Sequence, residues 1–224
     1  MAVHEEAYKR LIAQLQPHNI TLVAVSKTKP VSDIKELYDL GHRDFGENYV
    51  QEMVEKQVLC PGDIRWHYIG HLQSNKVKYI APFVAMVHAV DSLRLLQEIN
   101  KQAAKHGRVI DCLLQVHIAE EETKFGPDAA ELETLVQQWQ EQPATENVRI
   151  AGLMGMATNT SHEAQIEKEF RHLQQLHAQI KSRYFASQDH FRELSMGMSS
   201  DYPLALQAGS TLVRIGSLLS GARG

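Results

Sequence analysis

A lysine placed directly after a short apolar segment is the residue of this chain best positioned for chemistry. The run Thr21-Leu22-Val23-Ala24-Val25 stops at Ser26, and Pro30 ends any regular strand pairing. Lys27 is therefore expected at a strand end, facing whatever cleft that end meets. A partly shielded amine loses its proton more easily, as proteins that hold an aldehyde cofactor require. The alternative interpretation is a solvated loop cation.

Two later segments combine glycine with hydroxyl residues. Residues 194–201 read LSMGMSSD, and residues 213–217 read VRIGS. Glycine lets the backbone approach an anion closely, and serine hydroxyls with free N–H groups can complete a phosphate cradle. A serine before a helix is more often just an N-cap, so each segment alone has that alternative. Two such segments after successive predicted strands favour a phosphate site.

Arg214 lies inside the last apolar run, between Val213 and Ile215. Arginine is rarely buried without a partner. One interpretation is a structural salt bridge to an interior carboxylate. The other is a fixed donor to a bound ring, because an arginine beside a pyridine nitrogen disfavours a second positive charge there.

Three further predicted strand ends supply polar or soft side chains. Asn48 can begin a helix or bind a ligand, and His67 and Asn75 can belong to a turn or to a site wall. Met154 can be core or can border a cofactor.

Apolar runs and helical patterns alternate along the whole chain. The predicted strands are Leu22 to Ser26, Asp44 to Gly46, Arg65 to Ile69, Val84 to Ala89, Val109 to Val116, Ile150 to Met154, Arg192 to Met196, and Leu212 to Ile215. The predicted helices are Val3 to Leu15, Ser32 to Leu40, Asn48 to Leu59, Ser74 to Ile80, Ser92 to His106, Ala129 to Trp139, Glu163 to Tyr184, and Tyr202 to Ala208, with a stub at the end.

Eight strands buried on both faces, each followed by a helix, predict a parallel sheet. The fold class is therefore α/β: one (β/α)8 barrel of the TIM type over residues 1–224, with an extra N-terminal helix. A doubly wound open sheet is the alternative. A doubly wound sheet usually has a glycine-rich turn after its first strand, and Ser26-Lys27-Thr28-Lys29 has no glycine.

Composition narrows the class of protein. The chain has 224 residues, of which 43% are hydrophobic and 22% charged, and its net charge of -4 gives no basic field for nucleic acid or acidic membranes. No stretch approaches the ~18 apolar residues of a membrane span. The two cysteines form no CxxC motif, and no HExxH motif accompanies the histidines, so we expect a reducing cytoplasm and no metal.

Several long motifs resemble the pyridoxal phosphate homeostasis family over nearly the whole chain. They are LVAVSKTKP around Lys27, FGENYVQE from Phe45, WHYIGHLQSNK from Trp66, VHAVDS from Val87, KFG at Lys124, GLMGMA from Gly152, ELSMGMSSDYPLA from Glu193, and GSTLVRIGSLLSGAR near the end. The final LLSGAR differs mildly from the family's usual ending.

The resemblance implies pyridoxal 5'-phosphate held as a Schiff base on Lys27, with the pyridine nitrogen near Arg214. It implies a phosphate site at Ser199, Gly216 and Ser217, and a ring environment of Asn48, His67 and Met154. The family's fold looks like the barrel domain of alanine racemase.

Racemases of that fold add a second domain that supplies a catalytic tyrosine at a dimer interface. We expect no such domain after Gly224, and therefore a monomer that binds the cofactor and buffers vitamin B6 without catalysis. Free amino acids are a second expected ligand class. A racemase or related enzyme, and an interaction module with an incidental ligand, are the alternatives.

Overall fold

The eight predicted strands form one closed parallel barrel. The computed structural model describes residues 3–120 and 126–220. Each strand pairs with the next along the chain, and β8 returns to pair with β1, which confirms the (β/α)8 fold. The strands are β1 (Thr21–Val25), β2 (Asp44–Glu47), β3 (Arg65–Tyr68), β4 (Val84–Val90), β5 (Ile110–Val116), β6 (Val148–Gly155), β7 (Glu193–Met198) and β8 (Leu212–Ile215).

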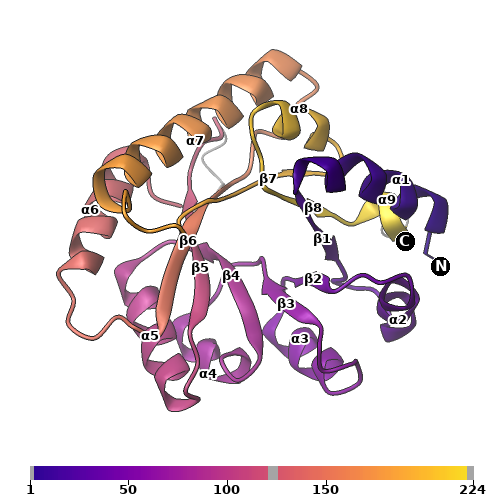
Figure 1. Cartoon of the computed structure of the whole chain (residues 1–224), viewed down its shortest axis with the longest axis horizontal. Helices are drawn as coiled ribbons and strands as arrows, with labels where there is room; N and C mark the ends of the chain where they lie inside the picture. The colour runs from indigo at the N-terminus through magenta and orange to yellow at the C-terminus, as the bar shows by residue number, and fades with distance from the viewer. Residues whose placement is uncertain (1–2, 121–125, 221–224) are drawn as a thin grey trace.

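Helices surround the strands and alternate with them along the chain, as Figure 1 shows. Between the strands and this outer layer lies the main core, which includes Phe45, Trp66, Phe170 and Phe191. The helical elements are α1 (Glu5–Leu15), η1 (Gln16–His18), α2 (Val31–Asp39), α3 (Val50–Gln57), η2 (Ser74–Lys76), α4 (Val77–Ile80), α5 (Leu93–Lys105), α6 (Ala129–Gln140), α7 (Glu163–Tyr184), α8 (Tyr202–Gln207) and α9 (Ser217–Ser220).

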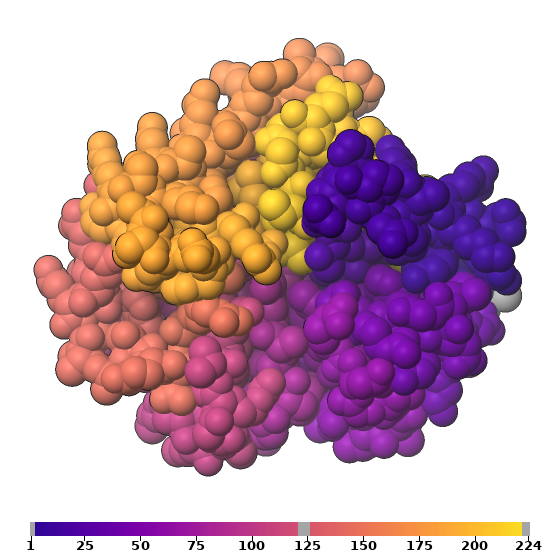
Figure 2. Space-filling view, viewed as in Figure 1, coloured from indigo at the N-terminus to yellow at the C-terminus, as the bar shows by residue number. Residues whose placement is uncertain are grey.

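The predicted N-terminal helix is α1, and it lies where the first and last parts of the chain meet. The β1–β8 register pairs Thr21 with Leu212 and Ala24 with Ile215. The His4 N–H donates to the Leu219 carbonyl at 2.8 Å, which joins the start of α1 to α9. In Figure 2 the indigo and yellow surfaces of these segments adjoin. The two chain ends therefore close the barrel together.

Helix α3 begins later than predicted. The N-cap is Tyr49, in an extended conformation, and the first helical residue is Val50 and not Asn48. The difference leaves Asn48 in the loop at the end of β2, where its side chain is available to the strand ends.

None of the helices in the described part of the chain combines the length and the apolar character that a membrane-spanning helix needs.

Candidate functional site

A cavity of about 500 Å³ opens at the C-terminal ends of the strands. We call it the strand-end cavity. This is the end of a (β/α)8 barrel where ligand sites are built. Its wall brings together six of the eight predicted site residues, with Ile69, Met156 and Met198 among the apolar ones. The six are Lys27, Asn48, Ser199, Arg214, Gly216 and Ser217.

Lys27 is held in the wall by its two neighbours. The Ser26 N–H donates to the Gly46 carbonyl at 3.0 Å, and Ser26 Oγ donates to Glu47 Oε1 at 2.6 Å. The Thr28 N–H donates to Glu52 Oε1 at 2.6 Å. Thr28 has a φ of +63°, which is costly for a β-branched residue. These bonds hold the backbone in place on both sides of Lys27.

A buried ion cluster lies behind this turn and is called the Lys56 cluster: Glu47, Glu52 and Lys56. Lys56 Nζ donates to Glu47 Oε1 at 2.8 Å and to Glu52 Oε1 at 2.6 Å, and also to the Ser26 carbonyl at 2.6 Å. Burial raises the pKa of Glu47, and hydrogen bonds from Lys56 and Ser26 oppose that shift. Its bonds connect α3 to the backbone on both sides of Lys27, at the Ser26 carbonyl and the Thr28 N–H.

The ends of β7 and β8 form the adjacent side of the cavity, since β8 pairs with β1. The Gly216 N–H donates to Ser199 Oγ at 3.3 Å, so the two loops meet there. The Met198 N–H donates to Asp201 Oδ1 at 2.6 Å, which fixes the turn that carries Ser199. A Cβ on Gly216 would lie 3.3 Å from the Val25 Cβ, so a side chain there would crowd the end of β1.

Arg214 is buried and reaches the cavity from β8. Its Nη1 donates to Ser195 Oγ at 2.5 Å, and its Nη2 donates to the Gly155 carbonyl at 3.2 Å. Burial lowers the pKa of Arg214 to about 10, and the charge of Asp201 opposes the shift. The guanidinium is therefore charged at neutral pH, and it has more donors than these two acceptors use.

Asn48 offers an acceptor of its own. Its Oδ1 is buried and has no hydrogen-bond partner among the described residues. The Asn48 carbonyl accepts from the Tyr68 hydroxyl at 2.9 Å, which fixes the loop. A Cβ on Gly70 would lie 2.4 Å from this same carbonyl oxygen, so only glycine allows β3 and the Asn48 loop to approach so closely. A buried unpaired acceptor at a cavity wall suits a polar ligand.

His67 and Met154 are not brought to the cavity wall. His67 is buried in the barrel interior, where both ring nitrogens bond to other side chains. Met154 packs with Val23, Met86 and other residues of an interior apolar cluster, two residues before Met156 of the wall. A direct contact of either side chain with a ligand ring stays a prediction. Lys124 and Phe125 of the KFG motif, and the last three residues of the final motif, lie outside the described residues.

Sequence reasoning missed Glu47, Glu52, Lys56 and Ser195. The first three lie in or just after the FGENYVQE motif, and a signal was present in the Glu52–Lys56 spacing of four on one helix. A glutamate ending a fully buried strand also demands a partner. Nothing local marks Ser195, because its partners come from distant strands.

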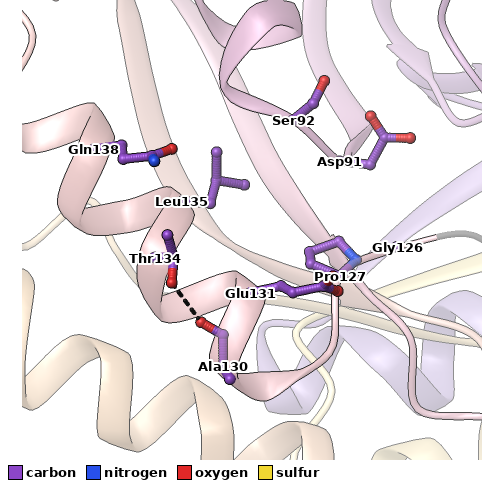
Figure 3. Close-up of a pocket in the computed structure, with 9 residues that line it drawn as sticks. All are labelled: Asp91, Ser92, Gly126, Pro127, Ala130, Glu131, Thr134, Leu135 and Gln138. Carbon is purple, nitrogen blue, oxygen red and sulfur yellow. Dashed lines mark hydrogen bonds between the residues drawn. The ribbon is translucent and has the colours of Figure 1, made fainter.

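A second hollow, about 670 Å³, lies on the flank of the barrel between α6 and the start of α5. Figure 3 shows this flank groove and its hydrogen bond from Thr134 Oγ1 to the Ala130 carbonyl, 3.0 Å long. Ser92 Oγ caps α5, and Glu131 Oε2 accepts from the Asp128 N–H at 3.0 Å. These groups serve the helices. In the described part of the chain, no group of three or more His, Cys, Asp or Glu residues could hold a metal ion.

The family model for the alanine racemase N-terminal domain matches residues 4–224. The chain is 41% identical over 211 residues to the pyridoxal phosphate homeostasis protein of Escherichia coli strain K12, covering 92% of this chain and 87% of the relative. Identity to the protein of that name from Aquifex aeolicus is 39% over 203 residues, covering 90% and 86%. These relatives are named for homeostasis and not for a reaction.

Solved structures of related proteins have the same barrel fold as this chain. PipY of Synechococcus elongatus PCC7942, with pyridoxal phosphate bound, has a TM-score of 0.86 and 35% identity, covering 96% of this chain and 99% of PipY. Alanine racemase from Bartonella henselae, at 16% identity and a TM-score of 0.71, shares the fold over 97% of this chain and 59% of its own. The chain therefore belongs to the alanine racemase N-terminal domain family and, within it, to the pyridoxal phosphate homeostasis proteins.

Proposed function

We propose that this protein binds pyridoxal phosphate in the strand-end cavity, covalently through Lys27, and serves vitamin B6 homeostasis without catalysing a reaction. One observation carries the proposal. A lysine amine, a buried arginine and the Ser199–Gly216 contact line one cavity of about 500 Å³. That is a volume typical of small-molecule and cofactor sites.

The residues present fit this cofactor. The Gly216 backbone and the hydroxyls of Ser199 and Ser217 suit a phosphate dianion. The buried Oδ1 of Asn48 can accept a hydrogen bond from a ligand. When bound, pyridoxal phosphate supplies an aldehyde that condenses with amines and a ring that withdraws electrons. Lys27 Nζ is the amine for that bond. The Arg214 guanidinium, charged at neutral pH, holds the proton on its own side of a hydrogen bond to the pyridine nitrogen.

Borohydride reduction followed by peptide mapping tests the covalent bond. We expect a pyridoxyl group on Lys27 and none on Lys27→Ala, which should keep its fold because one wall cation contributes little to the core. Lys29→Ala is the matched control. Lys29 lines the same cavity, and its Nζ donates to the Ser220 carbonyl at 2.8 Å. Labelling of wild-type protein on Lys29 or Lys76 would refute the assignment.

Absence of catalysis is tested separately. The loaded protein is incubated with L-alanine and other free amino acids in deuterated water, and Cα exchange and chirality are followed. We expect exchange no faster than with free cofactor. Rapid exchange with accumulation of the D-isomer, lost in Lys27→Ala, would establish the racemase alternative.

We also propose that one barrel, residues 1–224, binds as a monomer in the cytoplasm. The support is that all six wall residues come from one chain, and that Cys60 and Cys112 are both free. Sedimentation over a wide dilution series, with Schiff-base absorbance followed in parallel, tests the monomer. Cofactor loss that tracks dissociation of a dimer would contradict it.

A further inference from the structure

Five side chains form a continuous line of hydrogen bonds through the barrel interior. We call it the polar column: Asp44, His67, His88, Ser195 and Arg214. Asp44 Oδ1 lies 3.0 Å from His67 Nε2, and His67 Nδ1 lies 2.9 Å from His88 Nε2. His88 Nδ1 lies 3.0 Å from Ser195 Oγ, which accepts from Arg214 Nη1 at 2.5 Å. All five side chains belong to buried residues.

The column crosses the barrel and does not follow neighbouring strands. His88 is on β4 and Ser195 is on β7, which are not adjacent in the closed sheet. The column lies beside an apolar cluster of the kind that usually fills such barrels, with Val23, Met86 and Leu113 among its members. Burying polar groups here costs stability unless each one is bonded. A column that replaces ordinary packing therefore points to a role besides closing the barrel.

With both imidazole rings neutral, one arrangement of protons satisfies every bond of the column. Arg214 can only donate, so Ser195 Oγ accepts from it and gives its own proton to His88 Nδ1. His88 then carries its proton on Nε2 and donates to His67 Nδ1. His67 in turn donates from Nε2 to Asp44 Oδ1. Every donor then points from Arg214 toward Asp44.

The charges at the two ends agree with this direction. Burial alone would raise the pKa of Asp44, but hydrogen bonds from His67 and Arg65 outweigh it and hold that pKa well below its usual range. Burial, with His67 and Arg214 nearby, holds the pKa of His88 far below its ordinary value. The column thus has a carboxylate at one end, a guanidinium at the other, and a neutral His88 between them.

We propose that Asp44, His67, His88 and Ser195 are positioning residues that fix the Arg214 guanidinium as a directed donor toward a ring nitrogen in the strand-end cavity. The proposal rests on the proposed function for the identity of the ligand. Within the described part of the chain, Arg214 donates two hydrogen bonds, to Ser195 Oγ and to the Gly155 carbonyl. Without the Ser195 bond, the guanidinium would keep the Gly155 bond and could turn away from the ring nitrogen. His67 then matters to the ligand through Arg214 and not through contact.

Heteronuclear NMR of the imidazole nitrogens tests the column without any ligand. We expect His88 to carry its proton on Nε2 and not on Nδ1, and the Nε2 protons of His88 and His67 to exchange slowly with solvent. In Ser195→Ala, which removes the hydroxyl that donates to His88, the Nδ1 resonance of His88 should shift as it loses its donor. Protonation of His88 on Nδ1 in the wild-type protein would overturn the proposed direction.

Binding measurements test the positioning role. Pyridoxal phosphate is compared with an analogue in which C–H replaces the ring nitrogen. In Ser195→Ala we expect about tenfold weaker binding of pyridoxal phosphate, and a change of less than about threefold for the analogue. The matched control is Ser210→Ala, which removes a buried hydroxyl that lies within 2.8 to 3.1 Å of the Leu194, Met196 and Leu212 carbonyls outside the column and can donate to one of them at a time. It should weaken both ligands equally, if at all.

A second variant keeps the test valid if Ser195→Ala fails to fold. His88→Asn can still accept from Ser195 but cannot reach His67, so it cuts the column one step further from Arg214. It should again weaken pyridoxal phosphate more than the analogue, by a smaller factor. Equal losses for both ligands in both variants would overturn the positioning role. Failure of the wild-type protein to bind either ligand would refute the proposed function, while the NMR result would still decide the column.

Discussion

The strand-end cavity and the flank groove differ in how their polar groups are bonded, and this difference does not follow from their volumes. The flank groove is the larger, about 670 Å³ against about 500 Å³ for the strand-end cavity. Several polar groups of the groove bond within the helices that carry them, as Thr134 does with the Ala130 carbonyl. The cavity instead holds an acceptor, Asn48 Oδ1, that the described residues leave unbonded. Unused bonding capacity, and not volume, distinguishes a site from a gap between helices.

The largest expected effect is on the support behind the cavity. Lys56→Met leaves the carboxylates of Glu47 and Glu52 without their shared counter-ion, and Glu47 is 0% exposed. We expect the free energy of unfolding to fall by about 3–5 kcal/mol. Urea denaturation measures it.

The matched control for Lys56→Met lies in the helical layer. Arg183→Met breaks a pair with Glu133 whose Arg183 side chain is 61% exposed, and it should cost less than about 1 kcal/mol. Equal losses in the two variants would mean that the Lys56 cluster is no more than a surface ion pair.

Acid should destabilise the packing of the helical layer by protonating His177. Burial, with Lys181 nearby, lowers the pKa of His177 to about 4 from 6.5, and the ring stacks on Phe191. The folded state thus binds fewer protons between these values than the unfolded state does. The free energy of unfolding therefore keeps its full value, as far as His177 is concerned, above pH 6.5. It falls as the pH drops toward 4, by up to about 3 kcal/mol in total.

Denaturation of His177→Gln across pH 4 to 7 should show a flatter profile than the wild-type protein. His172→Gln, an exposed histidine on the same helix, is the control and should leave the profile unchanged. An unaltered profile in His177→Gln would assign the acid sensitivity to other groups.

Changes at the phosphate side of the strand-end cavity should lower the affinity for pyridoxal phosphate more than the affinity for pyridoxal. Ser199→Ala combined with Ser217→Ala removes two hydroxyls, each worth ~1.5–3 kcal/mol if bonded to a charged group, so affinity for pyridoxal phosphate should fall at least about tenfold. Titration followed by absorbance measures it. Pyridoxal without phosphate should be affected far less. Similar losses for both ligands would show that these serines do not contact the phosphate.

The smallest effect is expected at the flank groove. Asp128 Oδ1 accepts from the N–H groups of Ala130 and Glu131 at 2.9 Å, which caps α6. Asp128→Ala should cost about 1 kcal/mol of stability and leave affinity for pyridoxal phosphate unchanged. A change in affinity would mean that the groove communicates with the cavity, and the distinction between the two hollows would fail.

The barrel could be predicted because burial on both faces of each strand leaves a visible mark in the sequence. Even the short β2, Asp44–Glu47, was predicted within one residue, as Asp44 to Gly46. Boundaries were less accurate where a loop residue had helical character, as at Asn48 before α3. The motifs indicated which strand ends converge, and six of the eight named residues line the cavity.

The interior contacts could not be predicted. The His88–Ser195 bond joins residues 107 positions apart on strands that do not pair. Periodicity tells which residues point inward, but not which inward residues meet across a barrel. The bonds of His67 to Asp44 and His88 could not be predicted for the same reason, and its contact with a ligand ring, which the family resemblance implies, stays a prediction.

The β1–β8 seam has a consequence for the newly made protein. Lys27 follows the first strand, whereas Arg214 and Gly216 belong to the last strand and its end. On the ribosome, Lys27 emerges long before its cavity partners exist, and until then it is an ordinary exposed amine. Cofactor capture must wait until the final strand docks against the first. If the cofactor binds as proposed, it stabilises the closed seam by mass action, and opening the seam would expose the bond to Lys27 to hydrolysis by water.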